Sequence, residues 1–196
     1  MPWANGGGVT TEVIAWPSPD DWWWRLSMAT VDSDGPFSRF PDIDRTIALL
    51  DGAGFVLTID GEPDVTIDRR LEPFEFSGDA DTNCSLLGGP VCDLNLMSRR
   101  GPVRMQLEIV RLSEVRVLPA AVALLVLEEA IDVGDNTLSR WDAIVSPDGR
   151  AIRIPVRDVS TGAVVAVVRP INPRGGRRSG GRLSTSRTGS RRTPSR

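Results

Sequence analysis

Apolar and polar residues alternate along much of the chain, and the alternation is clearest in residues 24–31. There Trp24, Leu26 and Met28 fall on one face of an extended chain, and Arg25 and Ser27 fall on the other. A period of two residues is typical of a half-buried β-strand. Comparable short runs predict further strands at 45–50, 54–59, 65–67, 74–76, 84–87, 92–97, 104–110, 120–127, 143–145, 152–156 and 163–168.

Turn signals separate these runs about every ten residues, a spacing typical of antiparallel sandwiches and barrels. The signals are Asp51-Gly52, Asp60-Gly61, Gly78-Asp79, Gly88-Gly89-Pro90 and Asp148-Gly149. Only the segment 128–130 has a pattern that fits a helix, and no heptad or strand–helix alternation is present. We therefore predict an all-β fold of antiparallel strands.

The length of 196 residues and the apolar fraction of 40% fit one domain, or two tightly fused halves, with a sizeable core. The longest apolar run, 120–127, is shorter than the roughly 18 residues that a membrane span needs. No signal-peptide pattern opens the sequence, so the expected location is cytoplasmic. In that compartment Cys84 and Cys92 are expected to be buried free thiols, with a disulfide or half of a metal site as the alternatives.

Three missing residue types narrow the chemistry. The chain has no His, no Tyr and no Lys, so all 23 basic residues are Arg. Without His there is no Ser-His-Asp or Cys-His nucleophile system and no His-based zinc or iron site, and without Lys there is no Schiff base. Acid/base chemistry would have to use Asp, Glu or Cys. We therefore expect no metal site and no cofactor, and we assign no catalytic residue.

Charge is distributed unevenly along the chain. Residues 1–170 carry 15 Arg against 26 acidic residues, a formal charge of −11, whereas residues 171–196 carry 8 Arg and no acidic residue, a charge of +8. This tail is nearly free of apolar residues and is expected to be disordered. The tail is either a basic arm that binds nucleic acid or an extension without functional consequence. The acidic body and the absence of aromatic residues in the tail argue against nucleic acid.

Two segments near the N-terminus are unusual. The run Asn5-Gly6-Gly7-Gly8 permits positive φ and close backbone approach, and it predicts either a tight turn at a barrel rim or a loop that lines a ligand pocket. The run Trp22-Trp23-Trp24-Arg25 alternates in a strand, so Arg25 lies on the same face as Trp23. An arginine that points into a barrel needs a carboxylate partner or an anionic ligand.

Two later segments carry polar groups of the same kind. Residues 37–41 are expected to form a structured loop that enters a strand at Asp44-Arg45. An inward Arg45 would add a second guanidinium able to bind carboxylate bidentately; a surface salt bridge is the alternative. In residues 93–97, Asp93, Asn95 and Met97 share a face. If Asn95 points inward, its amide suits a small polar ligand. The alternative is a core or turn residue whose amide makes its hydrogen bonds within the protein.

These segments, in this order, resemble the HutD/Ves family. The family pattern reads approximately W-x-N-G-G-G-x-T-x-E, then D-W-x-W-R-L-S, then D-G-P-F-S-x-F-P-G-x-D-R. A G-D pair, C-x-L-x-x-G-P-x-x-D-x-N-x-M and R-R-G follow. The corresponding blocks here are 3–12, 21–27, 34–45, 78–79 and 84–101. The resemblance is dense over residues 2–101 and thin beyond them.

The resemblance implies a fold and an organisation. It implies a cupin-type β-barrel, an RmlC-like jelly roll, in a bacterial cytoplasmic protein. Residues 1–170 would form one bicupin domain with barrel-like halves at about 1–101 and 102–170, and the tail 171–196 would lie outside it. The chain departs from the family pattern at Asp42, where the family usually has Gly, so we expect strain in that turn.

The resemblance also implies a function, the binding of a small pathway molecule that governs histidine degradation without catalysing a step. The expected partner is a small anionic metabolite such as urocanate or formylglutamate, with no membrane partner; a homodimer is expected only if the barrels bury apolar faces between protomers. Arginines would hold a carboxylate, and Asn or Ser would orient a polar group. The pocket candidates are Asn5, Thr10, Glu12, Arg25, Ser27, Phe37, Ser38, Arg45, Asn95 and Arg99.

An enzymatic function is the alternative to ligand binding. A metal-independent cupin enzyme, an isomerase or hydrolase, would need a carboxylate as its general base. Glu12 and Asp79 are the candidates for that role, because a carboxyl group in an apolar barrel has a raised pKa.

Overall fold

The computed structural model describes residues 1–3, 6–101, 104–112, 116–146, 148–157 and 162–171. All regular elements in these ranges are strands, which confirms the all-β prediction. The predicted helical segment at 128–130 is wrong, because Glu128 is the last residue of a strand and Glu129 turns the chain with φ of +57°. The tail prediction falls almost entirely outside the described residues.

Nine strands come from the first half of the sequence and eight from the second, among the residues described. The first set is β1 (Gly8–Trp16), β2 (Trp24–Val31), β3 (Gly35–Phe37), β4 (Ile43–Asp51), β5 (Phe55–Ile59), β6 (Val65–Ile67), β7 (Phe74–Ser77), β8 (Thr82–Leu86) and β9 (Val91–Arg99). The second set is β10 (Met105–Arg111), β11 (Arg116–Ala121), β12 (Ala123–Glu128), β13 (Ile131–Val133), β14 (Asn136–Leu138), β15 (Ala143–Val145), β16 (Ile152–Arg157) and β17 (Val164–Pro170).

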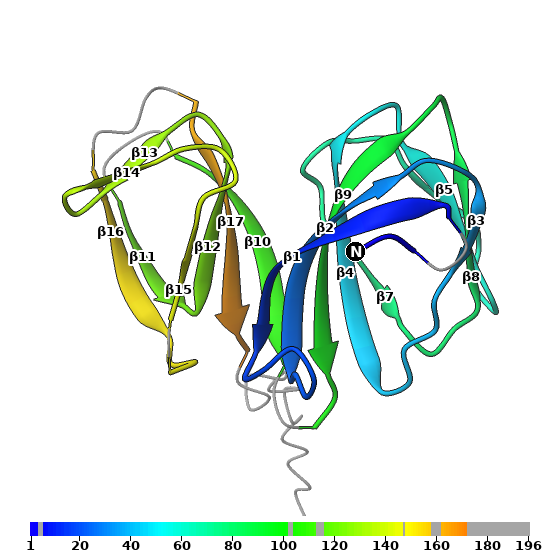
Figure 1. The fold of residues 1–196 in the computed structure, drawn as a ribbon, viewed down its shortest axis with the longest axis horizontal. Helices are drawn as coiled ribbons and strands as arrows, with labels where there is room; N and C mark the ends of the chain where they lie inside the picture. Colours follow the sequence, from blue (N-terminus) through cyan, green and yellow to red (C-terminus); the bar gives the residue numbers. More distant parts are fainter. Residues whose placement is uncertain (4–5, 102–103, 113–115, 147, 158–161, 172–196) are drawn as a thin grey trace, which may run out of the picture.

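Each set of strands forms two sheets, and the two sets lie side by side as two lobes (Figure 1). The first lobe has the sheets β1-β2-β9-β4-β7 and β3-β8-β5-β6, and the second has β10-β17-β12-β15 and β11-β16-β13-β14. The boundary between the two sets falls close to the one expected at about residue 101, and the organisation as one bicupin domain stays a prediction. No helix in the described ranges has the length and apolar character that a membrane crossing requires.

Three buried clusters account for the core. One lies inside the first lobe around Phe55 and Leu57, and one lies inside the second around Leu124 and Val126. The third joins the lobes, because Leu26 and Leu96 of the first pack with residues of the second such as Leu107. Strand alternation explains this arrangement, since one face of β2 and β9 turns to the second lobe and the other turns to the interior of the first.

Strand β9 lies in the centre of the five-stranded sheet and pairs with β2 on one side and β4 on the other. In this register Met97 lies opposite both Arg25 and Arg45. One pair of residues further along, Asn95 lies opposite Ser27 and Ile47. Residues in such register positions point to the same face of a sheet. The ladder therefore collects polar side chains from three strands on the inner face of the first lobe.

Candidate ligand-binding pocket

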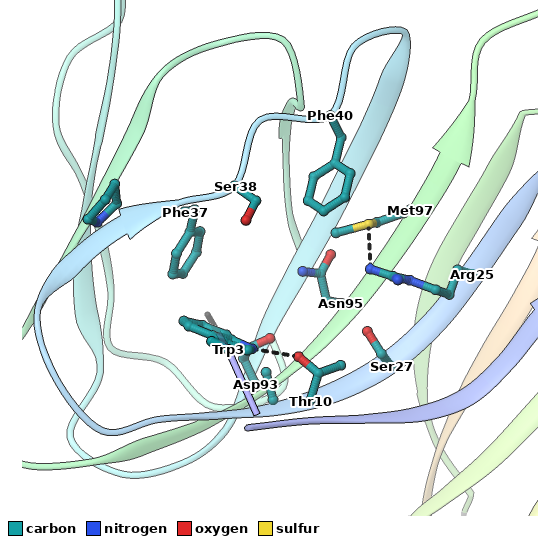
Figure 2. Close-up of a pocket in the computed structure, with 12 residues that line it drawn as sticks. Trp3, Thr10, Arg25, Ser27, Phe37, Ser38, Phe40, Asp93, Asn95 and Met97 are labelled. Carbon is teal, nitrogen blue, oxygen red and sulfur yellow. Dashed lines mark hydrogen bonds between the residues drawn. The ribbon is translucent and has the colours of Figure 1, made fainter. Parts of the chain in front are cut away.

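A cavity of about 350 Å³ opens into the first lobe on this inner face. Figure 2 shows the aromatic rings of Trp3 and Phe37 on one side of the space and Arg25 with Ser27 on the other. The lining residues are Trp3, Thr10, Arg25, Ser27, Ala29, Pro36, Phe37, Ser38, Phe40, Asp93, Asn95 and Met97. Strands β2 and β9 form its floor, and the segment 36–40 forms a wall.

Arg25 is half-buried at the polar end of the cavity. Its Nη2 donates a hydrogen bond to the sulfur of Met97 at 3.3 Å, and its Nε is buried without a partner among the described residues. Burial lowers the pKa of Arg25, and the negative charge of Glu12 partly offsets this effect. A thioether is a weak acceptor, so most of the hydrogen-bonding capacity of this guanidinium is unused.

Arg45 lies deeper, with 5% of its surface exposed. Its guanidinium carbon is 4.8 Å from the ring centre of Phe76, 5.3 Å from that of Phe37 and 5.6 Å from that of Phe40. Burial lowers the pKa of Arg45 to about 10, an effect that Asp93 opposes and Arg25 reinforces. The aromatic faces stabilise the cation where water cannot reach it.

Asp93 and Asn95 supply the polar groups of the floor. Both are buried, and the Oδ1 atom of each has no hydrogen-bond partner within the described part of the chain. Burial raises the pKa of Asp93 to about 7, although the charge of Arg45 acts in the opposite direction. Asp93 therefore changes its protonation state near neutral pH, and it can donate or accept a hydrogen bond there.

The aromatic wall is anchored by its own contacts. The indole Nε1 of Trp3 donates a hydrogen bond to Oγ1 of Thr10 at 2.7 Å, and the rings of Trp3 and Phe37 meet edge to face with centres 6.0 Å apart. A Cβ on Gly8 would lie 2.3 Å from the carbonyl oxygen of Thr30 and 3.2 Å from the Trp3 indole. Glycine at position 8 thus lets the N-terminal segment approach β2 closely enough to bring Trp3 to the cavity.

The structure brings together six of the residues that the sequence singled out, and places the others around or outside the cavity. Thr10, Arg25, Ser27, Phe37, Ser38 and Asn95 line it. Arg45 touches its aromatic wall from behind, and Glu12, which lies opposite Ser27 in the β1–β2 ladder, acts on Arg25 through its charge. Arg99 is an outer neighbour, 3.5 Å from a carboxylate oxygen of Asp21. Asn5 lies outside the described residues.

Sequence reasoning did not select Trp3, Phe40, Asp93 and Met97 as site residues. Alternation already placed Asp93 and Met97 on the same face as Asn95, so that signal was present in the sequence. The positions of Trp3 and Phe40 depend on loops, for which periodicity carries no information.

The described residues of this lobe give little support to a reactive thiol, a metal site or Asp79 as a base. Burial raises the pKa of Cys84 to about 12 and that of Cys92 to about 11, so both free thiols stay protonated and unreactive at neutral pH. The described residues contain no group of three or more His, Cys, Asp or Glu side chains that could hold a metal ion. Asp79, a candidate base, is held by Asp42, Arg100 and Ser77, which lower its pKa to about 2.

Comparison with known proteins identifies relatives over most of the chain. The model of the HutD family matches residues 1–164. An uncharacterized 21.2 kDa protein in the hutC 3′ region of Pseudomonas putida is 42% identical over 102 residues, which is 50% of this chain and 52% of that protein. Protein Ves of Citrobacter koseri is 30% identical over 150 residues, 76% of this chain and 78% of that protein. The match to the Pseudomonas putida relative thus spans about half its length.

Two solved structures are similar over nearly the whole described chain. One is a conserved protein of unknown function from Pseudomonas aeruginosa PAO1, with a TM-score of 0.73, 29% identity and coverage of 88% of this chain and 93% of that one. The other is HutD from Pseudomonas fluorescens SBW25, with a TM-score of 0.69, 30% identity and coverage of 88% and 94%. Together with the all-β architecture, these neighbours confirm the predicted cupin-type jelly roll.

Proposed function

The chain belongs to the HutD family, and we propose that it binds a small anionic metabolite in the cavity of its first lobe and serves histidine utilisation as a regulator rather than as a catalyst. The observation that carries the proposal is the clustering of unsatisfied polar atoms. Of the five buried side-chain polar atoms without a partner in the described residues, four belong to the pocket and its wall, on Arg25, Arg45, Asp93 and Asn95.

Buried polar atoms are nearly always hydrogen-bonded, because leaving one unpaired costs about 1–3 kcal/mol. Three of these atoms, on Arg25, Asp93 and Asn95, belong to residues that line one cavity, and a ligand could supply their partners. A ligand carboxylate can accept a hydrogen bond from Nε of Arg25, and donor groups of a ligand suit the oxygens of Asp93 and Asn95. Arg45 lies behind the aromatic wall and adds its positive charge from there. The volume of about 350 Å³ fits a small molecule rather than a polymer.

The charges of the pocket favour a ligand that is anionic in part and apolar in part. Arg25 lines the cavity, Arg45 lies behind its aromatic wall, and the lining carboxyl group of Asp93 has a pKa raised to about 7. The positive charge of the two guanidiniums therefore favours an anion. Trp3, Phe37 and Phe40 add apolar walls. Urocanate combines these properties, because its acrylate carboxylate is conjugated to a planar imidazole ring. Formylglutamate supplies the anionic part with two carboxylates and adds a polar formamide.

Calorimetric titration with a panel of urocanate, formylglutamate, formiminoglutamate and glutamate tests the proposal. A ligand at 100 times its Kd stabilises the folded protein by about 2.7 kcal/mol, so a thermal-shift measurement gives an independent readout. The informative variant is Arg25→Ala, because Arg25 lines the cavity; Arg69→Ala, an exposed arginine of the same lobe, is the control. The proposal predicts heat and a shift with at least one metabolite, lost in Arg25→Ala and kept in Arg69→Ala. No heat with any of the four would refute it.

One observation favours a second candidate function, a metal-independent isomerase or hydrolase. Asp93 is a buried carboxyl group in the cavity with a pKa raised to about 7, which is the property of a general base that works near neutral pH. It replaces Glu12 and Asp79 as the residue to test. Product formation from the bound metabolite, followed by chromatography and abolished by Asp93→Asn with binding retained, would establish catalysis. Unchanged metabolite after prolonged incubation would exclude it.

A further inference from the structure

The segment 36–40, which forms a wall of the cavity, is hydrogen-bonded to the turn at 78–79 near its C-terminal end. The amide of Phe40 donates to the carbonyl oxygen of Gly78 at 2.8 Å, and the amide of Gly78 donates to that of Ile43 at 2.8 Å. A Cβ on Gly78 would lie 2.8 Å from the carbonyl oxygens of both Ile43 and Phe40. Only glycine permits this contact, which holds the wall segment against the turn.

Asp79 and Arg100 complete the attachment through side chains. The Oδ1 atom of Asp79 accepts the amide of Asp42 at 2.8 Å, and its Oδ2 atom accepts from Ser77 Oγ at 2.9 Å and from Nη1 of Arg100. The amide of Arg100 donates to the carbonyl oxygen of Asp42 at 2.8 Å, and its Nε donates to Oδ1 of Asp44 at 2.6 Å. Both backbone polar groups of Asp42 are therefore held, one by Asp79 and one by Arg100.

Phe40 lies two residues before Asp42, next to this attachment. The ring centre of Phe40 is 5.8 Å from the guanidinium carbon of Arg25 and 5.6 Å from that of Arg45. Two like charges repel, and the charge of Arg25 accordingly lowers the pKa of Arg45. An aromatic face attracts both cations, so the ring stabilises them at a fixed separation.

We propose that Asp79 and Arg100 are positioning residues of the pocket: by holding Asp42 from both sides, they keep Phe40 against Arg25 and Arg45 and so set the affinity for an anion without contacting it. This inference rests on the proposed function where affinity is concerned. The arrangement of the two guanidiniums can be measured without any ligand, which separates the two proposals.

The experiment compares Asp79→Asn with Asp148→Asn. The control is matched, because Asp148 holds a second-lobe turn in the same way: its Oδ1 accepts from Ser146 Oγ at 2.9 Å and from the amide of Arg150 at 3.1 Å. The first readout is the set of Nε–Hε resonances of Arg25 and Arg45 in ¹H–¹⁵N spectra of the ligand-free protein. The ring current of Phe40 acts on both resonances, and Phe40→Leu identifies its contribution.

The expected result is that Asp79→Asn moves both arginine resonances in the direction that Phe40→Leu moves them, whereas Asp148→Asn leaves them in place. The dissociation constant for urocanate or formylglutamate, measured by calorimetry, is expected to rise about fivefold to tenfold in Asp79→Asn, the range that loss of one oriented charged contact produces. Arg100→Lys keeps the positive charge but loses the planar, two-pronged guanidinium. Its arginine resonances and its dissociation constant are expected to lie between those of the wild type and those of Asp79→Asn.

A purely structural role of Asp79 would lower the melting temperature and leave both arginine resonances and the dissociation constant unchanged at 25 °C; that result overturns the inference. If Asp79→Asn does not fold, Ser77→Ala is the milder variant, since it removes the hydrogen bonds that Ser77 Oγ makes with Asp79 and Arg100 and keeps the carboxylate, and it must move the same resonances by a smaller amount. If wild type binds no metabolite of the panel, the proposed function fails, and the arginine resonances still decide whether Asp79 positions the pocket.

Discussion

At the cavity, Arg25 donates a side-chain hydrogen bond to a thioether, the sulfur of Met97, at 3.3 Å. Sulfur is a weak acceptor, so this contact orients the guanidinium without competing strongly with an incoming carboxylate. The register of β2 against β9 produces the contact, because Arg25 lies directly opposite Met97. The same strand pairing thus supplies the charged group and keeps it available.

The first prediction follows from that contact. Arg25→Lys is expected to weaken binding of an anionic metabolite at least tenfold, because an ammonium group cannot make the bidentate contact. Met97→Leu, which keeps the volume and removes the weak acceptor, is expected to change the dissociation constant less than about threefold. Calorimetric titration of both variants checks this. Equal losses in the two variants would show that the thioether contact, rather than the fork of the guanidinium, determines affinity.

The second prediction concerns the dependence of stability on pH. The pKa of Asp93 is about 7 in the folded protein, and the reference value of 3.8 represents the unfolded chain. Between these two pH values the folded state retains a proton that the unfolded chain has lost. The stability that Asp93 contributes is therefore fully present below about pH 4, falls as pH rises and is lost above about pH 7. At most about 4 kcal/mol is involved, from 1.36 kcal/mol for each pKa unit.

Asp93→Asn removes this titration and is expected to flatten the fall in unfolding free energy between about pH 4 and pH 7, measured by urea denaturation at several pH values. Asp148→Asn is the control, because the stability that Asp148 contributes depends on pH in the opposite direction. The pKa of Asp148 is lowered by the amide of Arg150 and by Ser146, so its contribution is lost as pH falls rather than as pH rises. An unchanged slope in Asp93→Asn would mean that the carboxyl group is not buried in solution.

The inner face of the first lobe could be predicted from the sequence because it depends on strand alternation. The period of two placed Arg25 with Ser27, and Asp93 with Asn95 and Met97. The β2–β9 register puts both sets on one face, with Arg25 opposite Met97 and Ser27 opposite Asn95. The surroundings of Arg45 could not be predicted in this way. Phe37 reaches its guanidinium from the end of β3, Phe40 from the loop that follows and Phe76 from β7. Such contacts between separate segments have no signature in local periodicity.

The surroundings of Asp79 could not be predicted for a related reason. The sequence made it a candidate base on the expectation of a raised pKa, whereas Asp42 and Arg100, which the fold brings to it, hydrogen-bond its carboxylate and lower that pKa. The unusual residue at position 42 was, by contrast, visible in the sequence. Asp42 has φ of +60°, in the left-handed region where the family pattern has glycine.

The third prediction is that Asp42→Gly stabilises the protein. A left-handed conformation costs an ordinary L-residue roughly 1–2 kcal/mol, less for Asp, and glycine avoids it while losing more entropy on folding. The net gain in unfolding free energy is expected to be about 0.5 kcal/mol, with Asp42→Ala destabilising instead. Both are measured by denaturation. Because the backbone of Asp42 makes the hydrogen bonds to Asp79 and Arg100, neither change removes them. A loss of stability in Asp42→Gly would show that the Asp42 side chain itself makes a stabilising contact.

The fourth prediction is that the two lobes unfold as one unit. Leu96 is 1% exposed and belongs to the cluster that joins β2 and β9 to β10, β12 and β17. Leu96→Ala is expected to lower the unfolding free energy by 2–5 kcal/mol, the usual cost of that truncation in a core. Because the cluster is shared, hydrogen exchange should accelerate equally in the protected amides of β9 and of β17. Leu57→Ala, inside the first lobe alone, gives the decisive comparison. If it accelerates exchange in the first lobe and leaves β17 protected, the halves are independent folding units; if β17 responds as β9 does, the shared cluster makes the chain a single cooperative domain.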